Sequence, residues 1–108
     1  MAKKVVELST KRKVELRELS IDDMDYCSDL TIVKLDKDGE VEHIANMSKA
    51  RTAWLRRGVK GGDFKAFKLD AAGLVVDNVL KQLSEVEKNE LMNEIQDYQK
   101  MGEETPSS

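Results

Sequence analysis

The chain of 108 residues contains one cysteine, one histidine and one proline. A lone Cys27 excludes an intramolecular disulfide and is typical of a reducing compartment. With Cys27 and His43 as the sole thiol and imidazole, the chain cannot supply a Cys/His zinc cluster. We therefore predict no metal site.

Long apolar runs are also absent. No run approaches the roughly 18 residues that cross a bilayer, and no apolar segment follows the basic start at Lys3 and Lys4. We therefore expect no membrane association and a cytoplasmic location. Aromatic residues make up 5% and charged residues 36% of the chain, so the core should be small and aliphatic. We expect one domain over residues 1–102 and a disordered polar tail over residues 103–108.

Candidate catalytic residues are missing as well. No serine is framed by glycines, and no base is paired with Cys27, as nucleophilic catalysis would require. A calcium loop with Gly39 as its sixth residue would have Lys34 first and Ala45 twelfth, where carboxylates are needed. The sequence thus predicts a protein that is not an enzyme, with no catalytic or cofactor-binding residues and no cofactor.

Period-two alternation predicts an N-terminal β-hairpin from residues 4–9 and 12–19, joined by a loop slightly longer than two residues. Ser20 is a typical helix N-cap, and we expect the apolar residues of the following helix, from Ile21 to Leu30, to face the hairpin. Residues 31–45 favour a second hairpin around an Asp-Gly turn, and a helix with an interrupting loop is the alternative.

The C-terminal half is predicted to be helical. One helix begins at Asn46 or Ser48, buries a face, and ends before Gly58 as the C′ residue; that face comprises Met47, Ala50, Ala53 and Trp54. Residues 60–63 read as a flexible loop, and residues 70–83 as a core helix capped by Asp70.

Ser84 and Glu87 have the spacing of a capping box, which predicts a final helix that ends at Gly102. The fold class that we expect is therefore α+β: the N-terminal hairpin, a second hairpin at 31–45 as the favoured interpretation, and three to four helices packed on one face of a sheet.

Charge alternates in blocks along the chain, although the net charge is −3. Residues 49–69 carry seven basic residues and one acidic residue, between acidic blocks on both sides. Basic residues around Trp54 could contact nucleic acid, which is one hypothesis. We favour the other, in which Trp54 is in the core and the basic residues pair with the acidic C-terminal helix, within or between subunits.

The order of these segments resembles the tail assembly chaperones of long-tailed bacteriophages. The resemblance rests on the strand-to-helix junction from Val14 to Met24 (VELRELSIDDM) and on the later segment from Leu83 to Leu91 (LSEVEKNEL), and it spans about residues 3–98. It implies a protein that binds the tape measure protein, keeps it soluble and helps to recruit tail tube subunits.

The resemblance further implies a homo-oligomer that acts in the host cell cytoplasm and is absent from the mature virion. Another viral or bacterial adaptor module is the alternative function. An apolar strip on the final helix would suit partner binding, and its candidate residues are Met92, Ile95, Tyr98 and Met101. The competing interpretation is that this strip packs on the helix predicted at 70–83.

Overall fold

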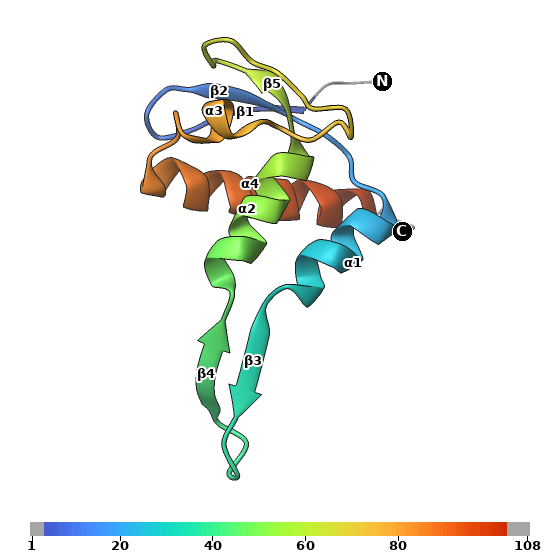
Figure 1. The fold of residues 1–108 in the computed structure, drawn as a ribbon, viewed down its shortest axis with the longest axis vertical. Coiled ribbons are helices and arrows are strands. Elements are labelled where there is room, and N and C mark those ends of the chain that lie inside the picture. The colour runs from blue at the N-terminus through green and yellow to red at the C-terminus, as the bar shows by residue number, and fades with distance from the viewer. Residues whose placement is uncertain (1–3, 104–108) are drawn as a thin grey trace.

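The computed structural model describes residues 4–103; the side chains of residues 32–34, 42–45 and 101–103 are outside the description. The fold is α+β, as predicted, with four helices, three of them of seven residues or more. A two-stranded arm projects from a body formed by the other elements (Figure 1). The predicted disordered tail falls outside the described residues except for Glu103, which ends the last helix.

The body contains a three-stranded antiparallel sheet in the order β1-β2-β5. β1 (Lys4–Glu7) and β2 (Lys13–Leu16) form the predicted hairpin. Their loop is longer than two residues, as predicted, and is closed by a bond from the Leu8 N–H to the Arg12 carbonyl. Val14 and Leu16 are buried, which confirms the period-two pattern.

β5 (Val59–Gly62) pairs with β2, so the prediction of a loop at 60–63 is wrong. Two glycines concealed this strand because they carry no side-chain pattern. Gly62 is required here, since its φ is +134° and a Cβ would lie 2.5 Å from the Lys13 carbonyl oxygen.

α1 (Ile21–Asp29) begins as predicted, with the Ser20 hydroxyl accepting a hydrogen bond from the Asp23 N–H at 3.1 Å. Cys27 is buried in the core against which Met24 packs. Ile21 is 72% exposed, which contradicts the expectation that it faces the hairpin. One turn of helix before Met24, it lies beyond the edge of the core.

β3 (Ile32–Leu35) and β4 (Val41–Ala45) confirm the second hairpin, so the alternative of a helix with an interrupting loop is wrong. We call residues 32–45 the arm. The Asp36 carboxylate accepts bonds from the Asp38 and Glu40 N–H groups, both at 2.9 Å, and Gly39 has the positive φ of +83° that the turn needs.

α2 (Met47–Gly58) has Asn46 at its N-cap position, in the left-handed region, without a capping bond from its side chain. The predicted buried face is correct for Ala50, Ala53 and Trp54, but Met47 is 59% exposed because the helix start extends past the body toward the arm.

Gly58 is the last residue of α2, and the prediction that it is the C′ residue beyond the helix end is wrong. Its role is steric. A Cβ on Gly58 would lie 2.6 Å from two side-chain carbons of Ile95, which is fully buried. The absence of a side chain thus lets α2 approach the C-terminal helix.

The core helix predicted at 70–83 is wrong. The Asp70 carboxylate caps a turn, accepting bonds from the Ala72 and Leu74 N–H groups, and Gly73 takes a φ of +82°. Within the predicted range, helix forms as α3 (Asp77–Leu80) alone. Apolar residues of this segment still fill the core, because an irregular chain can bury side chains that happen to have helical spacing.

α4 (Glu85–Glu103) crosses behind α2 in the view of Figure 1. Its predicted capping box is present: the Glu87 N–H donates to the Ser84 hydroxyl at 3.1 Å, and the Ser84 N–H donates to the Glu87 carboxylate at 2.8 Å. The helix continues one residue past the predicted end at Gly102.

Candidate protein-binding site

The residues of the apolar strip predicted on α4 do not share one environment: some lie in the core and others at the edge of the core. Ile95 is fully buried against Gly58, so its side chain contributes to the core and not to an open surface. Met92 and Tyr98 are half-buried and pack against the core. The side chain of Met101 lies outside the description. The structure therefore does not bring the three described residues, Met92, Ile95 and Tyr98, together on one exposed face.

An open pocket lies instead between α1 and α4, and we call it the α1–α4 groove. Its volume is about 580 Å³, and its lining combines apolar side chains with amide, hydroxyl and charged groups: Ile21, Met24, Asp25, Ser28, Trp54, Gln96, Gln99 and Lys100. Ile21 is 72% exposed, Met24 is half-buried and Trp54 is 8% exposed. They form an apolar surface from the core to solvent.

Gln99 fixes the groove's geometry. Its side-chain oxygen accepts a bond from the Leu19 N–H at 2.9 Å, and its side-chain nitrogen donates to the Arg17 carbonyl at 2.9 Å. Gln99 is buried, so both bonds are shielded from water. They attach α4 to the segment that leads from β2 into α1, and α1 is thereby held beside α4.

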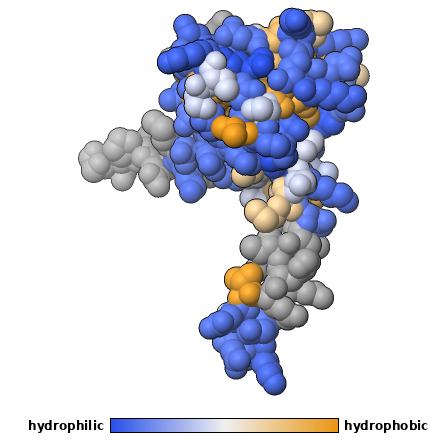
Figure 2. Space-filling model, turned by 90° about the vertical axis from the view of Figure 1, so that its left-hand side faces the viewer, coloured by the Kyte–Doolittle hydropathy of each residue, from blue (hydrophilic) through white to orange (hydrophobic). Residues whose placement is uncertain are grey.

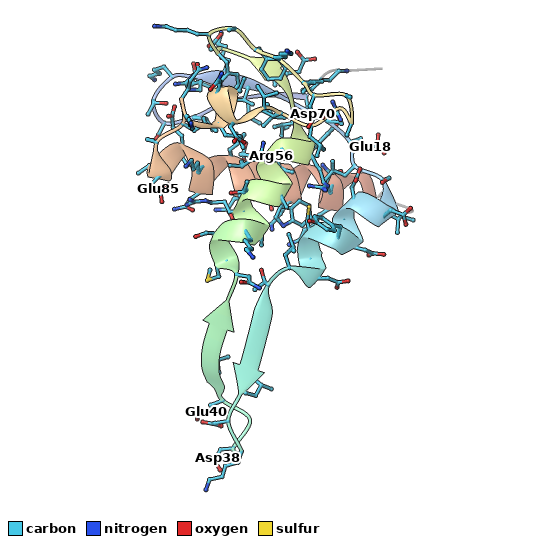
Figure 3. The ribbon with its side chains drawn as sticks, in the orientation of Figure 1. Glu18, Asp38, Glu40, Arg56, Asp70 and Glu85 are labelled. Carbon is cyan, nitrogen blue, oxygen red and sulfur yellow. The ribbon has the colours of Figure 1, made fainter. Side chains whose placement is uncertain are left out.

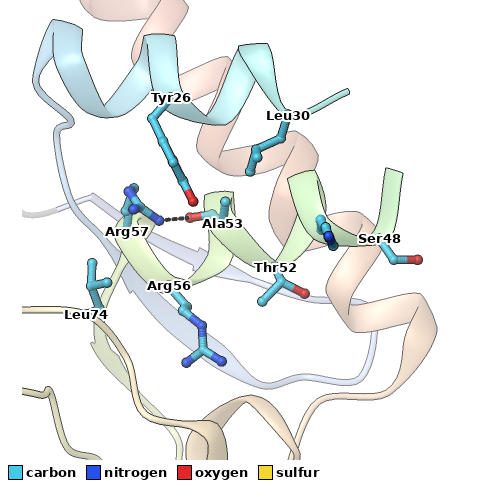
Figure 4. A pocket seen from close by; sticks show the side chains of 9 residues that line it. Tyr26, Leu30, Ser48, Thr52, Ala53, Arg56, Arg57 and Leu74 are labelled. Atoms are coloured by element: carbon cyan, nitrogen blue, oxygen red, sulfur yellow. Dashed lines mark hydrogen bonds between the residues drawn. The ribbon is translucent and has the colours of Figure 1, made fainter. Parts of the chain in front are cut away.

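A second pocket lies between α1 and α2, and we call it the α1–α2 groove. Figure 4 shows Tyr26 and Leu30 entering it from α1, with Thr52 and Arg56 opposite. Its volume is about 600 Å³, and it is lined by Tyr26, Leu30, Ser48, Lys49, Thr52, Ala53, Arg56, Arg57 and Leu74. At about 100° per residue, Tyr26 and Leu30 lie on the face of α1 opposite to that of Ile21 and Met24.

The α1–α2 groove is basic. The Arg57 guanidinium lies over the Tyr26 ring, 4.3 Å from its centroid, and its Nε lies 3.5 Å from the Asp23 carboxylate. Arg56 donates to the Val75 carbonyl at 2.6 Å and forms an ion pair with Asp77. These contacts hold the two guanidinium groups at the wall of the groove.

The predicted pairing of the basic block with the C-terminal helix is confirmed for Arg51, which forms a salt bridge with Glu85 at 3.1 Å. Arg56 and Arg57 pair elsewhere, as described above. Trp54 is a core residue, as predicted, and its ring is not displayed for base stacking.

The remaining titratable candidates are few. Burial raises the pKa of the Cys27 thiol; Arg57 opposes this effect and Asp23 adds to it. A raised pKa leaves less of the reactive thiolate. Among the side chains that the structure describes, no three His, Cys, Asp or Glu residues are grouped to hold a metal ion.

Comparisons with known proteins give no match to a family model, a curated protein or a solved structure. Within residues 4–103, no helix combines the length and apolar character that crossing a bilayer requires.

Sequence reasoning does not assign the α1–α4 groove because its walls come from helices that are far apart in the chain. A partial signal is present at Ile21, the first residue of α1, one turn ahead of the apolar Met24. Nothing in the sequence alone shows that α4, through Gln96 and Gln99, lies beside that turn.

Proposed function

We propose that this chain is a protein-binding assembly factor, and specifically a phage tail assembly chaperone that binds the tape measure protein in the α1–α4 groove. The observation that carries the proposal is the exposed apolar Ile21, continuous with Met24 and Trp54, in an open groove between two helices. Such a groove suits the apolar face of an amphipathic helix.

The groove and the family resemblance meet at the same residues. The junction from Val14 to Met24 carries the resemblance, and its helical end supplies Ile21 and Met24 to the groove. A long helical protein exposes apolar strips until tail tube subunits enclose it. A groove that covers part of such a strip would keep that protein soluble and leave the rest accessible to tube subunits.

In this proposal the chain acts without catalysis or a cofactor, in the host cell cytoplasm, and is absent from the finished virion. Polar groups at the groove rim, among them Gln96 and Lys100, would orient the bound helix while the apolar floor supplies most of the affinity.

The test is co-expression with a candidate tape measure protein, scored by the soluble fraction of that protein and by its co-purification with this chain. Ile21→Glu should abolish both, because it places a charge against the apolar strip of the partner. Val86→Glu is the matched control: Val86 is 59% exposed in the first turn of α4 and does not line the groove. The proposal fails if the wild-type chain neither solubilises the partner nor co-purifies with it, or if both variants behave alike.

A further inference from the structure

The arm lacks the support that a two-stranded sheet usually needs. β3 and β4 pair with each other and with no other described strand, and they project away from the body (Figure 1). Leu35 and Val41 face each other across the two strands, and each is 58% exposed. A lone hairpin is marginally stable in water. A neighbouring molecule would therefore stabilise this arm by burying its apolar surface and pairing its strand edges.

The tip of the arm is acidic. The tip carries Asp36, Asp38 and Glu40 against Lys37, a net charge of −2 (−3 + 1). Figure 3 shows Asp38 and Glu40 at the far end of the arm, remote from Arg56 on α2. In Figure 2 an apolar group is exposed on the arm beside this hydrophilic tip. The tip therefore presents an acidic patch next to an apolar one.

The α1–α2 groove complements that tip, and it lies at the base of the arm. Leu30 is the C-cap of α1 just before β3, and Ser48 and Lys49 lie in the first turn of α2 just after β4. The groove offers the apolar Leu30 and Leu74 and three cations. Lys49 makes no ion pair with the described residues, and Arg56 keeps N–H donors beyond those already bonded.

We propose that two copies of this chain form a two-fold dimer in which the acidic tip of each arm lies in the basic α1–α2 groove of the other. Strands of this length extend about 15 Å, so the tip does not reach the groove at the base of its own arm. When two arms lie antiparallel, however, each tip meets the other copy's base. The same contact then occurs twice, related by the two-fold axis, as in an isologous dimer.

The new part of this proposal is the contact between the arm tip and the α1–α2 groove, since the resemblance already implies a homo-oligomer but assigns no surface to it. The contact leaves the α1–α4 groove on the opposite face of α1 open. Binding of a partner protein and dimerisation can therefore fail separately. Loss of co-purification in Ile21→Glu with dimerisation intact would concern the partner alone.

The test uses charge exchange. The tip variant combines Asp38→Lys and Glu40→Lys; both residues contribute only backbone groups to the Asp36 turn, which should survive. The groove variant is Lys49→Glu, at an exposed position. Each variant alone opposes like charges and should associate at least about tenfold more weakly than wild type by analytical ultracentrifugation.

An equimolar mixture of the two variants should recover a heterodimer. The lysines introduced at the tip of one variant then meet the carboxylate that Lys49→Glu introduces in the other, while Lys49 of the tip variant meets a natural tip. Circular dichroism and thermal unfolding verify that each variant is folded. A monomeric wild type, unchanged association of both variants, or a mixture that fails to recover the dimer would overturn the proposal. So would binding of the tip by a different protein with no self-association.

Discussion

Glu87 should contribute a measurable share of the stability of the fold above pH 4.5. Its side chain is 6% exposed and accepts three hydrogen bonds from outside its own helix: from the Thr10 hydroxyl at 2.6 Å, the Arg12 Nε at 2.9 Å and the Ser84 N–H at 2.8 Å. The carboxylate thereby links the β1–β2 loop to the start of α4. Glu87→Gln removes the charge and one of the two equivalent acceptor oxygens.

The magnitude follows from the pKa. Burial raises the pKa of Glu87, but the hydrogen bonds from Thr10 and Ser84, together with the bond and charge of Arg12, outweigh it and lower the pKa from 4.5 to about 2. A decrease of roughly 2.5 units corresponds to about 3 kcal/mol of unfolding free energy. Because the pKa is lower in the folded state, this stability is fully present above pH 4.5 and is lost as the pH falls toward 2.

The assay is urea unfolding of wild type and Glu87→Gln at several pH values from 7 to 3. The difference in unfolding free energy should be about 3 kcal/mol at pH 7 and should fall to about half of that at pH 3. Taking the difference cancels the titration of the other carboxylates. Glu94→Gln is the control on the same helix; Glu94 has no hydrogen bond or ion pair with the described residues, so its change should stay within about 0.5 kcal/mol.

A Glu87→Gln difference that stays constant from pH 7 to pH 3 would refute the pKa argument. A difference below about 1 kcal/mol at pH 7 would refute the claim that the carboxylate links the two segments.

Two further substitutions test the packing of the helices. Gly58→Ala should destabilise the protein by about 1–3 kcal/mol in thermal unfolding, because its Cβ would overlap Ile95; combining it with Ile95→Ala should cost less than the sum of the single changes, and strict additivity would contradict the close contact. Ser20→Ala should cost about 1 kcal/mol through loss of the α1 cap, and Ser20→Gly only a few tenths; equal losses would argue against capping by the side chain.

The sequence is sufficient for those elements whose signals are local. The Ser20 cap, the Ser84–Glu87 capping box and both hairpins depend on residues within a few positions of one another, and all are present. Such short-range hydrogen bonds and turns leave a direct pattern in the sequence.

The errors concern contacts between distant segments. β5 contains two glycines and is a strand because β2 lies beside it. Residues 70–83 have helical spacing, yet the Asp70 turn and Gly73 direct the chain into a bridge between Leu69 and Val75. Ile95 belongs to an apolar strip at helical spacing, which favours a partner-binding surface. Spacing along one helix cannot show that α2, through Gly58, covers this side chain. The candidate groove escapes prediction for the same reason.

The two bonds of Gln99 also have a consequence for synthesis of the chain. They join residue 99 to residues 17 and 19, so the strand-to-helix junction near the start of the chain is completed by one of the last helical turns. While the protein emerges from the ribosome, the N-terminal hairpin can form early. The Leu19 N–H and the Arg17 carbonyl, however, lack these hydrogen-bond partners until Gln99 has been synthesised. The groove between α1 and α4 therefore comes into existence only when translation of the domain is nearly finished, and a nascent chain stopped before Gln99 would have no such groove to offer.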